Sequence, residues 1–153
     1  TLCADEQLDQ RQALRNRRAP LTSSEVGCYL SHLRAIRKAY EMQLRHIAIF
    51  EDDVVAEDHL ADLFKAIESL DNNAHLVRLM SLKRRKRKVT SQLTDHYQLI
   101  RPIRGALGTQ GYVLNREGMR RILEFGNTIS MPIDKLYDSF FLHTTLCSFQ
   151  SFF

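Results

Sequence analysis

The stretch His46-Ile47-Ala48-Ile49-Phe50-Glu51-Asp52-Asp53-Val54 places a short apolar run directly before three consecutive acidic residues. The run has the length and composition of a buried β-strand. In open α/β sheets, ligands bind at the carboxyl ends of the strands. Three crowded carboxylates are costly unless a cation neutralises part of their charge. The stretch therefore predicts a strand, and its acidic end is a candidate cation or ligand site.

Two of the three carboxylates are candidate metal ligands. Side chains alternate along an extended strand, so Glu51 and Asp53 are predicted to point to one side and Asp52 to the other. Carboxylate oxygens suit a hard divalent cation, and such a cation can in turn hold a diphosphate. The alternative is a strand that ends in a solvated acidic turn. Taken alone, the acidic run favours this alternative, because acidic strand ends are common.

Helices and strands alternate along the rest of the chain. Thr22-x-x-Glu25 has the spacing of a capping box, so Thr22 is the expected N-cap of a long helix. The pattern of apolar residues predicts helices over residues 23–44, 58–70, 116–125 and 133–144, and strands over 46–50, 75–80, 97–100 and 107–114. This alternation predicts an α/β fold, and the length suits a single domain over residues 1–153.

Four short motifs follow one another in a fixed order. They are Gly27-Cys28-x-x-Ser31-His32, Glu51-Asp52-Asp53, Gly108-Thr109-x-x-Tyr112 and Pro132-x-Asp134. Together they resemble glycosyltransferase family 25, the lipopolysaccharide and lipooligosaccharide sugar transferases to which the collagen galactosyltransferases are related. Four motifs in the same order are far more specific than any one of them. The resemblance extends over about residues 21–141.

The resemblance implies a fold and a reaction. The fold would be GT-A-like and bind a nucleotide sugar, with a mostly parallel sheet flanked by helices. The enzyme would move a hexose, with galactose expected, from a UDP-sugar to a lipooligosaccharide or lipopolysaccharide acceptor, with inversion and with Mn²⁺. Asp53 would bind the ion. Glu51 would bind it too, or contact ribose or sugar hydroxyls, while Asp52 would point into the supporting structure. Thr109 would belong to the donor-binding residues.

An inverting transferase also needs a base for the acceptor hydroxyl. Asp134 is the candidate, and Asp138, one helical turn later, is the second candidate. The alternative for both is capping and stabilisation of a helix N-terminus, which acidic residues commonly provide. For Asp138 this structural role is the favoured interpretation.

Two other residues of the first motif are expected to be structural. His32 is expected to be buried and to fix the acidic loop by hydrogen bonding, because no second histidine stands three or four residues away to complete a metal site. Cys28 lies on the predicted apolar face of the helix. It is expected to pack there and not to act as a nucleophile.

The positive charge is concentrated in Lys83-Arg84-Arg85-Lys86-Arg87-Lys88. Without these six residues, 16 basic residues face 18 acidic ones. Adjacent like charges repel, so the run predicts a solvated, mobile loop. Its expected partner is an anionic membrane surface or a phosphorylated glycolipid, and the alternative is a loop with no partner. Nucleic acid is not expected, because no aromatic residues or recognised motif accompany the run.

Two departures from the family pattern shape a second hypothesis. The family's first strand, with an Ile-Asn-Leu-Asp-x-x-x-x-Arg pattern, has no counterpart in residues 1–20, which are polar and rich in arginine. The chain ends at Phe153, where relatives usually continue. We therefore expect a domain that is shortened at both ends or that lacks internal segments. The alternative function is a catalytically incomplete remnant, or a glycan- or nucleotide-binding module of the same fold.

The sequence also gives expectations about location. No apolar run is long enough to span a bilayer, and residues 1–20 contain no apolar signal segment. The three cysteines are widely spaced and have no metal-site spacing, which is typical of reduced thiols. These features predict a cytoplasmic protein, with the basic run allowing peripheral contact with the inner membrane.

Overall fold

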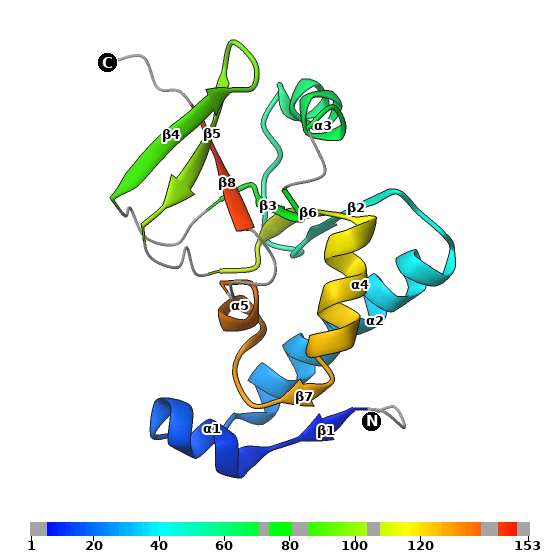
Figure 1. Cartoon of the computed structure of the whole chain (residues 1–153), viewed down its shortest axis with the longest axis vertical. Helices are drawn as coiled ribbons and strands as arrows, with labels where there is room; N and C mark the ends of the chain where they lie inside the picture. Colours follow the sequence, from blue (N-terminus) through cyan, green and yellow to red (C-terminus); the bar gives the residue numbers. More distant parts are fainter. Residues whose placement is uncertain (1–5, 71–73, 81–85, 104–107, 139–143, 150–153) are drawn as a thin grey trace.

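A mixed six-stranded sheet forms the centre of the protein (Figure 1). The computed structural model describes residues 6–70, 74–80, 86–103, 108–138 and 144–149. The strand order is β2-β6-β3-β8-β5-β4. The strands are β2 (His46–Phe50), β3 (Leu76–Arg78), β4 (Arg87–Gln92), β5 (Tyr97–Pro102), β6 (Gly111–Asn115) and β8 (Thr144–Phe149).

The directions of these strands correct one prediction. The mixed α/β composition is confirmed, but the expected mostly parallel sheet is wrong, because only the pairing of β3 with β8 is parallel. Strand β6 lies between β2 and β3 and runs antiparallel to both. Strands β4 and β5 form a hairpin, which antiparallel strands permit with a short connection.

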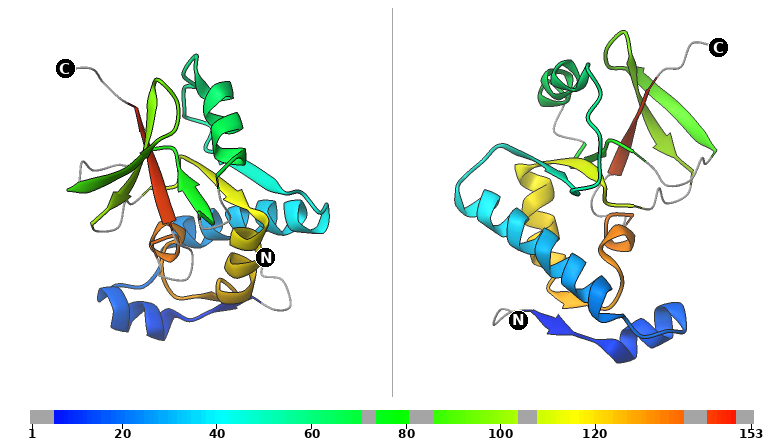
Figure 2. Two further views of the ribbon diagram at one scale, coloured as in Figure 1. Left: turned by 45° about the horizontal axis from the view of Figure 1, so that its top comes forward. Right: turned by 180° about the vertical axis from the view of Figure 1, so that it is seen from behind.

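Helices cover both faces of the sheet. Those on one face are α2 (Ser23–Glu41), α4 (Arg116–Phe125) and α5 (Ile133–Leu136), and α3 (Leu60–Glu68) lies on the other. Figure 2 shows the same separation from two further directions. Side chains alternate along β6, so Tyr112 and Leu114 enter the larger core under α2 and α4, and Val113 enters the smaller core under α3.

The capping box predicted at the start of α2 is confirmed. The hydroxyl of Thr22 accepts from the backbone N–H of Glu25 at 3.2 Å, and the Glu25 carboxylate accepts from the N–H of Thr22 at 2.8 Å. The helix ends earlier than residue 44. Gln43 takes a left-handed conformation with φ 59°, which is common just beyond a helix and prevents its continuation.

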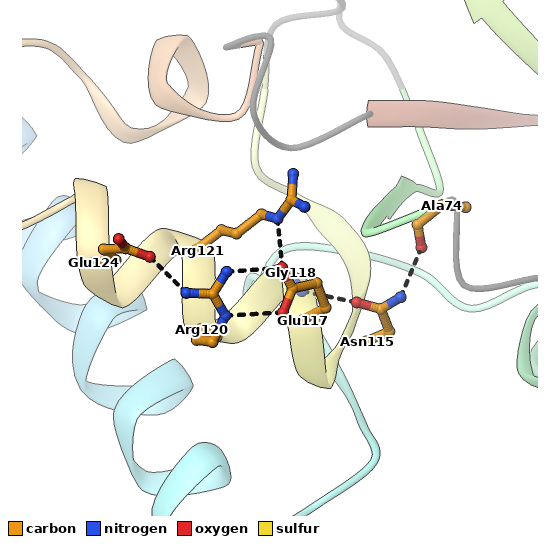
Figure 3. Close-up of polar contacts among 7 residues, drawn as sticks. All are labelled: Ala74, Asn115, Glu117, Gly118, Arg120, Arg121 and Glu124. Atoms are coloured by element: carbon orange, nitrogen blue, oxygen red, sulfur yellow. Dashed lines mark hydrogen bonds and ion pairs between the residues drawn. The ribbon is translucent and has the colours of Figure 1, made fainter.

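Helix α4 has the predicted bounds, and polar contacts hold its first turn (Figure 3). The Asn115 side chain accepts from the N–H of Gly118 at 2.7 Å and donates to the carbonyl of Ala74 at 3.2 Å. Arg120 and Arg121 both donate to the carboxylate of Glu117. Asn115 thereby joins the start of α4 to the segment that leads into β3.

The arginine-rich N-terminal region folds into elements that its polar composition did not predict. Strand β1 (Gln7–Leu8) pairs in parallel with β7 (Thr128–Ile129), and helix α1 (Gln10–Arg17) follows. The side chain of Gln10 donates to the carbonyl of Leu21 and accepts from its N–H. These two hydrogen bonds tie α1 to the residue just before the N-cap of α2.

The last predicted helix is wrong beyond its first turn. Helix α5 ends at Leu136, and Thr144, the last residue of the predicted helix, begins strand β8. Other predicted bounds differ by a few residues: α3 spans 60–68, β3 spans 76–78, β5 spans 97–102 and β6 spans 111–115. Residues 107 and 139–143 lie outside the described residues.

The basic run is only partly a loop. Residues 83–85 lie outside the described residues, and Lys86 is exposed just before β4. Arg87 and Lys88 begin β4, where Lys88 pairs with Arg101 of β5. The prediction of a solvated loop is therefore wrong for these two residues. β4 is an edge strand of the sheet, and charged side chains are commonly placed on such edges.

No helix in the described part of the chain is long and apolar enough to cross a membrane.

Candidate functional site

The carboxyl end of β2 meets the segment that leads into β6. Strand β2 pairs with β6 as far as Phe50 opposite Gly111, and the next N–H, from Glu51, donates to the carbonyl of Gln110 at 2.9 Å. This register sets the Glu51 carboxylate beside Thr109, whose buried hydroxyl donates to it. The structure therefore brings together two residues that the sequence assigned to one site.

His32 approaches the same carboxylate from α2. Its Nδ1 lies 2.8 Å from the hydroxyl of Tyr112, and its Nε2 lies 3.9 Å from Oε1 of Glu51. Burial lowers the pKa of His32, and the negative charge of Glu51 opposes this effect. The prediction of a buried, hydrogen-bonded histidine next to the acidic segment is confirmed. The imidazole is held in place because the Tyr112 hydroxyl also lies 2.6 Å from that of Tyr137.

Cys28 lies one helical turn before His32, and its side chain is exposed. The prediction that it packs in the core is wrong, because successive helical residues are about 100° apart and the core side of α2 is taken by its neighbours Tyr29 and Leu30. Desolvation raises the pKa of the Cys28 thiol, as do the nearby charges of Glu51 and Asp134, while Thr109 opposes the shift by hydrogen bonding. The thiol therefore lies at the solvent-exposed side of the site, close to Glu51.

Asp134 reaches the site from α5. Its Oδ2 accepts from the N–H of Gly108 at 3.4 Å, and Gly108 has a φ of 88°, a backbone conformation that favours glycine. The N-cap of α5 is Pro132, and no side chain caps this helix. The carboxylate of Asp134 is thus directed at the Gly108–Thr109 segment, which supports a role other than helix capping.

Asp138 lies in a different setting. Its Oδ1 is 3.0 Å from Nη2 of Arg78, which also donates to the backbone carbonyl of Asp134 at 2.7 Å. The Arg78 side chain is 1% exposed. Desolvation lowers its pKa, and the charge of Asp138 opposes this effect. This arrangement favours the structural interpretation of Asp138. Sequence reasoning did not single out Arg78, which joins β3 to α5 beneath the site.

Asp52 and Asp53 are exposed in a turn after β2. The expected alternation of Glu51, Asp52 and Asp53 assumed an extended strand, but the strand ends at Phe50. Among the described histidine, cysteine and acidic side chains, those grouped closely with Glu51 are instead Cys28 and His32.

Two hollows flank this site. One of about 760 Å³ contains Asp134 and is lined by Asn16, Arg17, Glu25, Met131, Pro132 and Lys135. The other, of about 200 Å³, lies on the α3 side of β2 and is lined mainly by apolar residues, including Phe50, Val54, Leu60 and Leu79. Charged residues such as Arg17, Glu25 and Lys135 therefore line the first hollow, whereas mainly apolar residues line the second.

Acidic groups, a hydroxyl and an imidazole thus meet at a strand end of an α/β domain, which makes this the candidate functional site. The model of a family described as Glycosyltransferase family 25 (LPS biosynthesis protein) matches residues 3–137. The chain belongs to this family. All four sequence motifs lie within the matched residues.

Individual relatives support the same assignment. The chain is 33% identical over 113 residues to the lacto-N-neotetraose biosynthesis glycosyltransferase LgtE of Neisseria meningitidis serogroup B, covering 68% of this chain and 40% of the relative. It is 26% identical over 131 residues to a candidate glycosyltransferase of Haemophilus influenzae, covering 84% and 46%. It is 25% identical over 122 residues to mouse procollagen galactosyltransferase 2, covering 76% and 19%. The chain spans less than half the length of these relatives.

Proposed function

We propose that this protein is a glycosyltransferase that moves a hexose from a UDP-sugar to a lipooligosaccharide or lipopolysaccharide acceptor. The observation that carries the proposal is the meeting of Glu51, Thr109 and Asp134 at the end of β2 in a chain of family 25. Galactose is the proposed hexose. It is supported by the resemblance to a procollagen galactosyltransferase and to an enzyme of lacto-N-neotetraose biosynthesis.

The donor's diphosphate requires positive charge as the glycosidic bond breaks. The carboxylates of Glu51, Asp52 and Asp53 are hard oxygen ligands, and those of Asp52 and Asp53 are exposed to solvent. Their chemistry therefore fits a divalent cation such as Mn²⁺, with Asp53 and Glu51 as the proposed ligands. When bound, the cation supplies charge stabilisation to the leaving diphosphate. Thr109 holds the carboxylate of Glu51 in one orientation through its hydrogen bond.

Asp134 is the proposed base. In an inverting transfer, the acceptor hydroxyl oxygen bonds to the anomeric carbon while the bond to the diphosphate breaks, and the electron pair of that bond leaves with the diphosphate. The carboxylate of Asp134 takes the proton of the hydroxyl. The hollow lined by Arg17, Pro132 and Lys135 lies beside Asp134 and offers space for the acceptor next to charged side chains. Asp138 stays the second candidate.

Titration calorimetry of UDP, with Mn²⁺ or with a chelator, tests the donor site. We expect Mn²⁺ to increase UDP affinity and Asp53→Asn to remove this increase. Asp62→Asn is a matched control, because Asp62 is an exposed carboxylate on α3 whose ion pair with Lys65 lies outside the site. Equal affinity with Mn²⁺ and with chelator would contradict the metal clamp.

A second candidate function is a catalytically incomplete remnant, or a nucleotide- or glycan-binding module of the same fold. It is supported by the exposed position of Asp52 and Asp53 in the turn after β2, whereas Glu51 lies beside Cys28 and His32. A transfer assay with UDP-galactose and a lipooligosaccharide acceptor separates the two candidates. Metal-dependent UDP binding without sugar transfer would favour the binding module, and transfer that depends on Asp134 would favour the enzyme.

A further inference from the structure

We propose that Cys28, His32 and Glu51 form a binding site for a borderline transition-metal ion of the Zn²⁺ or Co²⁺ type. The site is distinct in chemistry from the all-carboxylate clamp at Glu51 and Asp53. It uses two residues to which the proposed transferase mechanism gives no role. The inference stands on geometry alone and does not depend on sugar transfer.

The three side chains already converge. One ligand atom from each residue, the thiol sulfur, an imidazole nitrogen and a carboxylate oxygen, lies within 4.8 Å of the other two. Ligands of a tetrahedral Zn²⁺ are separated by roughly 3.5 Å, given bonds of about 2.0–2.3 Å. The separation of His32 Nε2 from Glu51 Oε1 is 3.9 Å. The exposed Cys28 side chain can turn toward them, so a small contraction completes the site.

The backbone places these ligands for a physical reason. Cys28 and His32 are four residues apart on α2, so their side chains lie one above the other on the same helix face. Glu51 comes from the end of β2, opposite this face. A helix pair at i and i+4 with a third ligand from another element is a common construction for a three-ligand metal site with one open position.

Two of the ligands are held by further hydrogen bonds. Tyr112 is paired with Nδ1 of His32, and Thr109 donates to Glu51. When Nδ1 carries the proton and donates it to the Tyr112 hydroxyl oxygen, the lone pair of Nε2 is directed at Glu51. Outer hydrogen bonds of this kind fix the orientation of metal-binding side chains.

The types of ligand determine the class of metal. A thiolate and an imidazole favour Zn²⁺ or Co²⁺, whereas Mn²⁺ and Mg²⁺ prefer oxygen ligands. Binding replaces the S–H proton of Cys28 by a bond to the metal and releases that proton to solvent. Because Glu51 belongs to both sites, a Zn²⁺ ion held by Cys28 and His32 withdraws Glu51 from the proposed donor clamp.

Cobalt titration of the full, metal-free chain tests the proposal without any donor or acceptor. Thiolate bound to Co²⁺ gives a charge-transfer absorption band, and a four-coordinate ion gives intense visible bands. We expect both bands to appear at one equivalent of Co²⁺ and to be abolished by one equivalent of Zn²⁺. Cys28→Ser should lose the charge-transfer band, and Cys3→Ser, which removes a thiol from another part of the sequence, should keep it.

A second variant tests the orienting hydrogen bond. Tyr112→Phe keeps the ring and removes the hydroxyl, so we expect it to weaken Co²⁺ affinity about 10- to 100-fold while the charge-transfer band stays at saturation. Circular dichroism checks that each variant remains folded. Retention of the band in Cys28→Ser, or absence of any band in the folded wild type, would overturn the proposal. Either result would leave the UDP titration with Mn²⁺ unaffected, so the two proposals fail separately.

Discussion

The Thr109 hydroxyl donates to the Glu51 carboxylate across 58 residues of sequence, and this contact joins the end of β2 to the approach to β6. Thr109 is buried, so nothing from solvent can easily replace its hydroxyl. Glu51 also lies near His32 and Cys28. The position of this single carboxylate therefore links the proposed donor site to the proposed metal site.

Thr109→Val should weaken both sites by releasing Glu51 from its fixed orientation. Valine has a similar shape but cannot donate a hydrogen bond, so we expect a loss of about 1 kcal/mol in stability and a lower affinity for UDP in the presence of Mn²⁺. Thr109→Ser keeps the hydroxyl and should retain most of the affinity. Calorimetry and thermal unfolding measure the two effects. Equal UDP affinity in the valine and serine variants would show that the hydrogen bond does not position Glu51.

Asp134→Asn should lower turnover by about 10²- to 10⁴-fold, because asparagine cannot take the acceptor proton. Donor affinity should stay nearly unchanged, since a base acts in the transition state. Asp138→Asn is the comparison. This variant removes a charged partner of buried Arg78. It should therefore lower the free energy of unfolding more than it lowers the rate of transfer. Turnover of Asp134→Asn within a few-fold of wild type would make Asp134 structural.

Local sequence signals predicted the elements that they control directly. The capping box fixed the start of α2, the short apolar run predicted β2, and the apolar spacing gave the bounds of α4. Strand direction depends on long-range pairing. Nothing near Gly111–Asn115 in the sequence indicates that β6 lies between β2 and β3. The prediction of a mostly parallel sheet is therefore wrong at β6, which runs antiparallel to both neighbours.

The candidate site was also predictable only in part, because local motifs name its residues but long-range contacts arrange them. The motifs brought Glu51, Thr109 and Asp134 into one hypothesis, and the structure brings Glu51 to Thr109 and Asp134 to the neighbouring Gly108. Cys28 was assigned to the wrong side of α2, because a shift of one residue turns a helical side chain by about 100°. Its spacing of four residues from His32 on α2 places both side chains on one helix face, and this spacing is the sequence signal for their proximity.

Two glycines in helices should respond oppositely to alanine. At Gly118, an added Cβ would lie 2.1 Å from the carbonyl oxygen of His75, so the start of α4 must move and Gly118→Ala should destabilise the protein. At Gly27, the added Cβ meets nothing within 4 Å. Gly27→Ala should therefore stabilise α2 by about 0.5–1 kcal/mol, through the lower conformational entropy of the unfolded chain. Urea unfolding of both variants measures the difference. Similar effects at the two positions would contradict the packing at Gly118.

Glu117 should contribute a small, pH-dependent stabilisation. Hydrogen bonds from Arg120 and Arg121 lower its pKa from 4.5 to about 2. A carboxylate with a depressed pKa stabilises the folded state above its unfolded pKa, and this contribution is lost as the pH falls from about 4.5 toward 2. The group is partly exposed, so we expect less than about 1 kcal/mol, which salt reduces further.

Comparison of wild type with Glu117→Gln in urea unfolding at a series of pH values measures this contribution. The difference in unfolding free energy should be largest near neutral pH and shrink below pH 4.5. Glu124→Gln is the control, because in the contacts drawn in Figure 3 Glu124 accepts only from Nη1 of Arg120. A difference that does not change with pH would show that the variant acts through packing and not through charge.

The basic run Lys83–Lys88 is proposed to bring the protein to an anionic membrane or a phosphorylated glycolipid. Lys86 and Lys88 are exposed at the outer edge of the sheet, where β4 has one neighbour in the described structure. Each cation near an anionic leaflet is worth roughly 1 kcal/mol, so six would give reversible attachment without an apolar anchor. The attachment should weaken as salt rises, because exposed charges are screened beyond about 8 Å at physiological ionic strength.

Sedimentation with vesicles tests this attachment. Wild type should pellet with vesicles that contain phosphatidylserine and stay in the supernatant with neutral ones, and replacement of all six basic residues by glutamine should abolish pelleting. A control that replaces Arg11, Arg15 and Arg120 by glutamine removes positive charge elsewhere on the surface and should pellet more like wild type. If anionic vesicles fail to pellet the protein but a phosphorylated oligosaccharide binds it in calorimetry, the run contacts the acceptor. Binding by neither would leave the run as a solvated edge without a partner.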